Sequence, residues 1–298
     1  MCGIFGCVLK EGDAASIIHA ALKRLEYRGY DSVGEATIHK KKLFVKKDKG
    51  KIDEVHAIHD LDNLPGRVGV GHTRWATHGA PSQANAHPHL DCSGAIAVVH
   101  NGIIENFAFL KKELEDLGHG FKSKTDTEVI AHLIEENMKK KPNEDFENAV
   151  RGAVERLDGS YAIAVISKEE PDKIVCARKE SPLVVGLGKD GVYCASDIPA
   201  FLPLTNKVVI VNDGELVILT EESCEIRKIS DGSPISRKPE TIDWSSEMAE
   251  KHGYPHFMLK EIHEQPLSLR NTLRLQEQYL DLMATFLERA TEVFLVAA

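Results

Sequence analysis

The sequence lacks the features that would place this chain in a membrane or on nucleic acid. A membrane-spanning helix needs roughly 20 apolar residues, whereas the longest apolar runs, such as Tyr161–Ile166 and Val208–Val211, are far shorter. The formal net charge is −9. It argues against nucleic acid or an anionic membrane as the main partner, because neither would attract the chain over long range.

Paired cysteine motifs are also missing. The sequence has no C-x-x-C spacing, and its amino terminus does not resemble a secretory signal peptide. The scattered cysteines therefore predict reduced thiols in a cytoplasmic protein. The six are Cys2, Cys7, Cys92, Cys176, Cys194 and Cys224.

What is present is an ordinary globular composition, 298 residues of which 42% are hydrophobic and 28% charged. Helical patterns gather in residues 104–157, and from residue 159 onward short strand patterns follow one another. Turn signals such as Asn212-Asp213-Gly214 separate these strands at hairpin spacing. Clustered helices with hairpin-linked strands indicate an α+β fold with largely antiparallel sheets.

Several segments carry specific expectations. A β-branched strand over Ala95–His100 runs into Asn101-Gly102, and a helix is predicted over Ile104–Leu117. Residues 257–264 and 267–292 also have helical patterns, and residues 293–298 resemble the start of a buried strand. A chain that ends on such an apolar run is expected to be a truncated piece of a longer protein.

The amino terminus is the first candidate for chemistry. Cys2 becomes the terminal residue if Met1 is removed, and it would then carry a thiol and a free α-amine together. An α-amine titrates at about 7.7–8.0, so part of it is an unprotonated base near neutral pH. A nucleophile needs such a base within hydrogen-bond reach. The alternative is that Cys2 is only a small residue at the end of a buried strand.

A polar segment follows the strand expected over Arg67–His72. It begins with Thr73-Arg74-Trp75-Ala76-Thr77-His78-Gly79 and continues to His89 with hardly an apolar residue. Loops of this length inside a compact domain are usually functional.

These stretches together resemble one family. The matching segments are Cys2-Gly3-Ile4-Phe5-Gly6, Leu25–Ser32, Gly71–Gly79, Asn85–His89, His100–Asn106, Thr125–Glu128, Ala195-Ser196-Asp197 and Lys260–Pro266. In sequence and order they are similar to the glucosamine-6-phosphate synthases, the glutamine–fructose-6-phosphate amidotransferases. Each segment alone is weak evidence, but all occur in register over most of the chain.

The resemblance implies an N-terminal-nucleophile hydrolase fold, a four-layer αββα sandwich. It implies a glutaminase domain over residues 2–230, a linker over 231–245 and the incomplete start of a sugar-phosphate isomerase domain over 246–298. The family's sugar-phosphate-binding loop would follow Ala298. The chain is therefore expected to hydrolyse glutamine without channelling the ammonia to a sugar. The resemblance implies no cofactor and no metal.

The implied catalytic residues are Cys2, Asn101 and Gly102. Cys2 would attack the side-chain amide carbon of glutamine, release ammonia and form a thioester that water hydrolyses. The Asn101 side-chain amide and the Gly102 backbone N–H would stabilise the oxyanion that forms in both steps. Taken alone, Asn101-Gly102 is a hairpin signal. Arg28 is similar to a family residue that orients the amino-terminal region.

The implied substrate-binding residues are Arg74, Trp75, Thr77, His78 and Asp126. Arg74 can pair with the α-carboxylate of glutamine, and Asp126 can accept hydrogen bonds from its α-amine. Trp75 is similar to the residue that gates the family's ammonia channel. Each also has a structural alternative: a surface ion pair for Arg74, a packing aromatic for Trp75, and a helix cap for Asp126.

Three alternatives stay open. His87 and His89, with Asp91 and Cys92, could supply zinc ligands, although no paired metal-binding spacing supports this. Glutaminase domains of the purine-pathway phosphoribosyl amidotransferase or of asparagine synthetase share the amino-terminal cysteine. A silent binding module with the same fold is the third. The expected partners are L-glutamine and an isomerase domain that binds fructose 6-phosphate, with a homo-oligomer as an option for the full-length enzyme.

Overall fold

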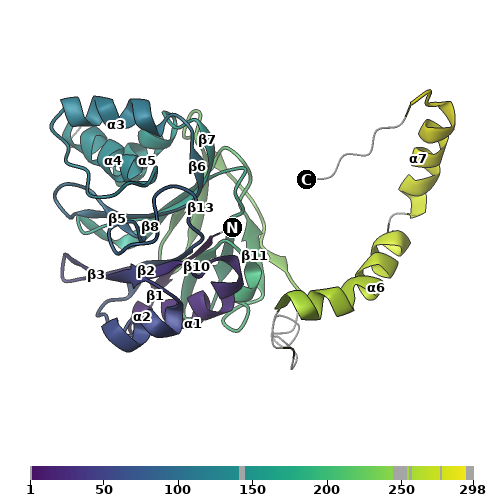
Figure 1. Cartoon of the computed structure of the whole chain (residues 1–298), viewed down its shortest axis with the longest axis horizontal. Coiled ribbons are helices and arrows are strands. Elements are labelled where there is room, and N and C mark those ends of the chain that lie inside the picture. Colours follow the sequence, from purple (N-terminus) through teal and green to yellow (C-terminus); the bar gives the residue numbers. More distant parts are fainter. Residues whose placement is uncertain (1, 141–144, 244–253, 255–256, 276, 293–298) are drawn as a thin grey trace. The chain divides into compact units, whose positions relative to one another are not determined.

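The structure is a computed structural model that describes residues 2–140, 145–243, 254, 257–275 and 277–292. The chain divides into two units, Met1–Ser246 and Glu247–Ala298. The first unit is built on two antiparallel sheets (Figure 1).

The first sheet has eight strands, with β1 near its centre. In spatial order they are β15 (Glu240–Thr241), β11 (Lys207–Ile210), β9 (Val184–Leu187), β10 (Gly191–Ala195), β1 (Gly3–Leu9), β4 (Val68–Arg74), β2 (Ser32–His39) and β3 (Lys42–Lys49). β1 is fully buried along its length and pairs with β10 on one side and β4 on the other. The amino terminus is therefore anchored in the middle of the sheet.

The second sheet has seven strands. In spatial order they are β14 (Pro234–Ile235), β13 (Cys224–Lys228), β12 (Glu215–Leu219), β8 (Glu170–Lys179), β7 (Gly159–Ser167), β6 (Ile96–Ile104) and β5 (His89–Leu90). The long β6–β7–β8 meander forms its main part, and each pairing is antiparallel.

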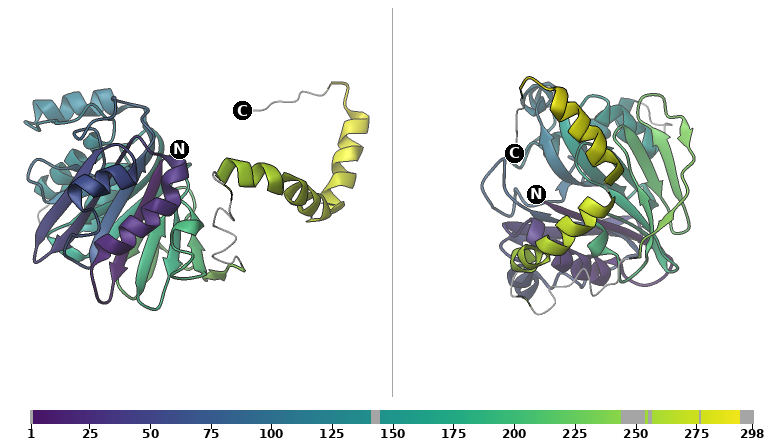
Figure 2. Two further views of the ribbon diagram at one scale, coloured as in Figure 1. Left: turned by 60° about the horizontal axis from the view of Figure 1, so that its bottom comes forward. Right: turned by 90° about the vertical axis from the view of Figure 1, so that its right-hand side faces the viewer.

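Helices cover the outer face of each sheet (Figures 1 and 2). The helices are α1 (Ala14–Leu25), α2 (Ile52–His59), α3 (Phe107–Asp116), α4 (Glu128–Lys140) and α5 (Phe146–Val154), with 3-10 turns η1 (Glu26–Arg28) and η2 (Ile198–Ala200). α1 and α2 share an apolar cluster with the first sheet, and α3, α4 and α5 share another with the second.

A third apolar cluster joins the two sheets. It contains Ile4, Val8 and Val70 from the first sheet, and Val99 and Ala164 from the second. Alternation along each strand explains this arrangement, because successive side chains point to opposite faces. The result is a four-layer αββα sandwich, which confirms the predicted fold class.

β6 differs from its prediction. It does not end at His100 but continues through Asn101 and Gly102 to Ile104, paired throughout with β7. Gly102 has φ +126°, and a Cβ there would lie 2.1 Å from the Ser160 carbonyl oxygen. Glycine thus lets the strand continue where the sequence indicated a turn. The following helix α3 consequently begins later than expected.

Two short strands lie within the predicted linker 231–245. β14 pairs with β13, and β15 pairs with β11, so this segment extends both sheets. The domain boundaries themselves stay a prediction.

The second unit contains α6 (Phe257–Leu275) and α7 (Glu277–Arg289). α6 runs through Pro266, so the expected break at residues 265–266 is absent; α6 ends at Leu275, and α7 begins at Glu277. The strand expected over 293–298 lies outside the described residues. Among the described helices, none combines the length and apolar character needed to cross a bilayer.

Candidate active site

Cys2 directly precedes β1, where several distant segments meet. Gly3 allows this close approach, since a Cβ at that position would lie 2.6 Å from Thr73 Oγ1 and 2.8 Å from Leu25 Cβ. β1 is held on its other side by Ser196, whose hydroxyl accepts a hydrogen bond from the Ile4 amide at 3.0 Å. The position of Cys2 is thus fixed by the backbone around it.

Three residues predicted for the site contact Cys2. The Trp75 amide donates to Cys2 Sγ at 3.2 Å, the Arg28 Nε donates to the Cys2 carbonyl oxygen at 3.1 Å, and Asn101 Nδ2 donates to the same oxygen at 2.9 Å. Burial raises the pKa of the Cys2 thiol, while the Trp75 amide and the guanidinium groups of Arg74 and Arg28 act in the opposite direction. A nucleophile beside cations and N–H donors suits reactions that develop negative charge.

Arg28 is positioned by residues to which the sequence analysis gave no role. Its side chain is buried and forms an ion pair with Asp197 at 3.0 Å. The Tyr27 hydroxyl donates to the same Asp197 oxygen at 2.5 Å. In the sequence, only the similarity of the segment Ala195-Ser196-Asp197 to the family pointed to Ser196 and Asp197. They act through Arg28 and β1 and hold the amino terminus in place.

His72 orients Asn101 and was likewise not predicted. Its Nε2 lies 3.0 Å from Asn101 Oδ1 and 3.0 Å from the His100 carbonyl oxygen. Burial lowers the pKa of His72 to about 3, so the ring is neutral. Since both neighbours of Nε2 are acceptors, the ring proton lies on Nε2. This hydrogen bond holds Asn101 Oδ1, and the Asn101 NH₂ therefore faces Cys2.

Arg74 is a buried cation at the end of β4, with only 4% of its surface exposed. Its NH2 donates to the carbonyl oxygens of His78 and Gly79. Its NH1 has no hydrogen-bond partner among the described residues. Burial lowers the pKa of Arg74, and the nearby Cys2, Asp126 and Asp31 oppose that shift. A buried guanidinium with an unused donor can bind a carboxylate bidentately.

The loop after Arg74 is held against the preceding turn. The Asp31 amide donates to the Arg74 carbonyl oxygen at 2.9 Å, and the Ala76 amide donates to Asp31 Oδ2 at 2.8 Å. A Cβ on Gly29 would lie 2.6 Å from the Arg74 carbonyl carbon, so only glycine fits there.

The remaining predicted residues lie around this loop. Trp75 is half-exposed and packs edge-on against Tyr30, with ring centroids 5.4 Å apart. Thr77 is exposed, and His78 packs edge-on against Phe107. Asp126 is buried, and its Oδ2 accepts from the Ile104 amide at 2.8 Å.

The zinc ligands considered in the sequence do not converge. His87 stacks on His72 at 4.1 Å and meets His89 edge-on at 4.7 Å inside the sandwich. Asp91 instead binds backbone amides of its own turn, including those of Ala95 and Ile96 at 2.7 Å. Cys92 has other neighbours, His119 and His132.

Comparison with known proteins places this chain in a family. A family model described as a glutamine amidotransferase domain matches residues 72–203. A glutamine–fructose-6-phosphate aminotransferase (isomerizing) of Methanothermobacter thermautotrophicus is 54% identical over 275 residues, 92% of this chain and 45% of that protein. The protein of the same name from Thermococcus kodakarensis is 48% identical over 299 residues, 100% of this chain and 49% of that protein.

A solved structure agrees. The glutamine phosphoribosylpyrophosphate amidotransferase from B. subtilis, complexed with ADP and GMP, aligns with a TM-score of 0.66 and 28% identity, covering 77% of this chain and 50% of that one. The chain spans about half the length of the curated relatives it matches. By sequence and fold, it belongs to the glutamine amidotransferases, in the family of the glutamine–fructose-6-phosphate aminotransferases.

Proposed function

We propose that this chain hydrolyses L-glutamine to glutamate and ammonia, with Cys2 as the nucleophile once Met1 has been removed. In the complete enzyme, the ammonia would be used to convert fructose 6-phosphate to glucosamine 6-phosphate. The relatives are named as glutamine–fructose-6-phosphate aminotransferases (isomerizing), which supports this role. The observation that carries the proposal is the group of donors around Cys2, namely the Trp75 amide, Arg28 and Asn101 Nδ2.

The reaction has two halves. The Cys2 sulfur attacks the amide carbon, its proton passes through the α-amine to the leaving nitrogen, and ammonia departs to leave a thioester. Water then attacks the thioester carbon, and the sulfur leaves as glutamate forms. In each half the carbonyl oxygen becomes an oxyanion. Asn101 Nδ2 and the Gly102 N–H are the proposed donors to it, and losing one such donor costs on the order of 3 kcal/mol of barrier.

The proposed recognition of glutamine uses the two oppositely charged groups on its α-carbon, the carboxylate and the amine. Arg74 NH1 would bind the α-carboxylate, and Asp126 would accept from the α-amine. Trp75, Thr77 and His78 form the loop that would lie over the substrate. Arg28 has a structural role, since it binds the Cys2 carbonyl oxygen.

We propose that the protein acts in the cytoplasm, that residues 246–298 begin a domain for sugar-phosphate isomerisation, and that the full-length enzyme forms a homo-oligomer. The thiols support the first of these, because all six cysteines are free.

Intact mass and ammonia release, measured together on the wild type and on Cys2→Ala, test the catalytic proposal. We expect wild-type protein without Met1 to release ammonia from glutamine, and Cys2→Ala to release none. Cys224→Ser, which alters a half-buried thiol on β13, is the matched control and should retain full activity. Undiminished activity in Cys2→Ala would exclude this mechanism. Absence of activity in wild type that has lost Met1 would favour the silent binding module.

A further inference from the structure

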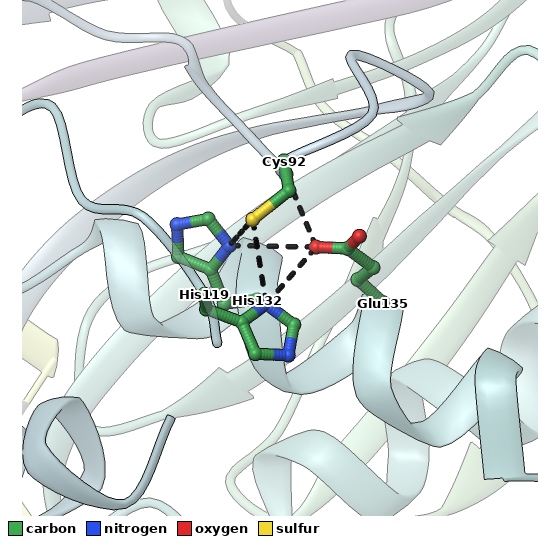
Figure 3. Close-up of side chains that lie close together, drawn as sticks. All are labelled: Cys92, His119, His132 and Glu135. Atoms are coloured by element: carbon green, nitrogen blue, oxygen red, sulfur yellow. Dashed lines mark hydrogen bonds and ion pairs between the residues drawn. The ribbon is translucent and has the colours of Figure 1, made fainter. Parts of the chain in front are cut away.

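Four potential metal ligands meet on the outer layer of the second sheet (Figure 3). Cys92 lies in the turn between β5 and β6, and His119 follows α3. His132 and Glu135 lie three residues apart on α4, so they share one face of that helix. One ligand atom from each residue lies within 4.8 Å of the others. The two imidazoles and Glu135 are buried, whereas Cys92 is exposed.

The separations fit a tetrahedral centre. Cys92 Sγ lies 3.5 Å from Nδ1 of His119 and 3.5 Å from Nδ1 of His132. Glu135 Oε2 lies 3.1 Å from the first Nδ1 and 3.5 Å from the second. Zinc bonds are about 2.0–2.1 Å to nitrogen or oxygen and about 2.3 Å to sulfur. In a tetrahedral centre, these bond lengths place a sulfur and a nitrogen ligand about 3.6 Å apart, and a nitrogen and an oxygen ligand about 3.3 Å apart.

The far side of each imidazole faces a second carboxylate. His119 Nε2 lies 3.2 Å from Glu136 Oε2, and His132 Nε2 lies 3.6 Å from Glu128 Oε1. With a metal bound at each Nδ1, each ring would carry its proton on Nε2, on the side where these two carboxylates lie. Metal-binding histidines commonly have this outer carboxylate.

A metal ion at the centre would balance the charge of Glu135, whose Oε2 also accepts a hydrogen bond from the Cys92 amide at 3.1 Å. Glu128 is fixed by the amides of Lys122 and Ser123, at 2.8 and 2.6 Å, so its side of His132 is preorganised. Glu135 is held by Lys139 at 2.8 Å through its other oxygen, Oε1. The inner oxygen, Oε2, is thereby directed toward the two imidazoles.

We propose that Cys92 Sγ, His119 Nδ1, His132 Nδ1 and Glu135 Oε2 bind one zinc ion. Binding releases the Cys92 thiol proton to solvent, and the thiolate and carboxylate then balance the two positive charges of the metal. A sulfur, two imidazoles and a carboxylate suit zinc rather than magnesium or calcium, which prefer oxygen ligands.

Four protein ligands leave no open coordination position, so the site is structural. The zinc would join the β5–β6 turn, the segment after α3 and the helix α4. Exposed Cys92 gives the ion a path from solvent.

The first test is the zinc content of the full 298-residue chain, measured by mass spectrometry of the metal after extensive desalting. We expect about one zinc per wild-type chain and less than about a tenth of that in Cys92→Ser. Cys224→Ser is the matched control and should retain its zinc. Equal zinc in wild type and Cys92→Ser would overturn the proposal. The proposal would also be overturned if the wild type contained no zinc after purification and bound none after incubation with ZnCl₂. That result is expected if the histidines only form hydrogen bonds or ion pairs with the carboxylates.

Two further measurements examine the ligands and the outer carboxylate. Cobalt(II) substituted into the wild type should show a thiolate charge-transfer band and the intense visible bands of tetrahedral coordination, and Cys92→Ser should lack the first. Glu136→Gln should lower zinc affinity about 10–100-fold in competition with a chromophoric chelator. Octahedral cobalt spectra, or unchanged affinity in Glu136→Gln, would contradict the geometry.

Discussion

At the scale of single residues, the candidate site depends on side chains that hold the proposed catalytic residues in position. His72 is fully buried, and its Nε2–H holds the Asn101 carboxamide so that the NH₂ faces Cys2. An amide is nearly symmetric in shape, and without this donor Asn101 could present its oxygen instead. An oxygen there would repel the oxyanion of the proposed reaction. His72 is therefore a positioning residue whose effect passes through Asn101.

We predict that His72→Phe lowers kcat for glutamine hydrolysis by about 100-fold and leaves KM nearly unchanged, because only transition-state stabilisation is lost. His72→Gln, which retains an N–H donor, should recover part of the rate. Steady-state kinetics of these variants in wild-type and Asn101→Ala backgrounds provide the test. In the Asn101→Ala background, His72→Phe should have little further effect. Fully additive losses would contradict the positioning role.

Glu35 is expected to make the stability of the chain depend strongly on pH. It is fully buried on β2, and neither carboxylate oxygen has a hydrogen-bond partner among the described residues. Burial raises the pKa of Glu35 to about 9, while the nearby Lys46 acts in the opposite direction. Between its ordinary value and about 9, the folded chain retains a proton that the unfolded chain has released. The free energy of unfolding therefore falls as pH rises through this range.

We predict that Glu35→Gln removes this dependence. The stability difference between Glu35→Gln and wild type should grow by about 1.4 kcal/mol per pH unit between pH 5 and 8. Denaturant unfolding at several pH values measures it. Asp53→Asn, which alters an exposed carboxylate on α2, is the control and should follow wild type much more closely. Parallel stability curves for Glu35→Gln and wild type would show that Glu35 is ionised in the folded chain.

At the scale of elements, β6 links the site to the second sheet. It places Asn101 beside Cys2, and it continues through Gly102 because it stays paired with β7 as far as Ile104. That pairing requires the close approach of Gly102 to the Ser160 carbonyl. A side chain at residue 102 would separate the two strands at the point where the proposed oxyanion donors lie.

Gly102→Ala is accordingly predicted to destabilise the fold by about 2 kcal/mol or more and to abolish most glutamine hydrolysis. Gly214→Ala is a suitable comparison. Gly214 also has a positive φ, of +77°, but nothing lies within 4 Å of its added Cβ. It should cost about 1 kcal/mol and leave activity unchanged. Thermal unfolding and ammonia release measure both effects. Equal losses in the two variants would show that backbone strain, not the contact with Ser160, dominates.

Local sequence patterns predicted most strands but not the full length of β6. Period-2 alternation and turn signals predicted the antiparallel strands, and motif order led to Cys2, Arg74 and Asn101. The continuation of β6 was missed because Asn-Gly is a turn signal, and only pairing with β7 overrides it. Propensity is a local quantity, whereas strand pairing depends on a segment about 60 residues away.

The partners of Cys92 and Arg28 were missed for the same reason. The sequence indicated Cys92 as a zinc ligand beside His87 and His89, not beside His119 and His132. Cys92, His119 and His132 come from three separate segments, and no short spacing in the sequence brings them together. Asp197 contacts Arg28 across 169 residues of chain. A pattern search finds ligands that share a helix or a turn, as His132 and Glu135 do, but not ligands that only the fold assembles.

At the scale of the whole molecule, the two units differ in how they bury apolar surface. The three apolar clusters lie within Met1–Ser246, as does every candidate site residue. In the second unit, Met258, Leu269 and Phe286 are among the described apolar side chains that are exposed, at 73%, 65% and 68%. Exposed apolar side chains contribute little to folding, because they are not removed from water.

We therefore predict that a chain of residues 1–246 folds and releases ammonia from glutamine at a rate within about twofold of the 298-residue chain, because the apolar clusters and the candidate site residues all belong to that unit. The two proteins should also have similar unfolding midpoints. Ammonia release and thermal unfolding, compared under the same conditions after confirmed loss of Met1, measure both quantities. The Cys2→Ala variant of each chain controls for contaminating glutaminase. A loss of more than about tenfold in the shorter chain would show that residues 247–298 support the site around Cys2.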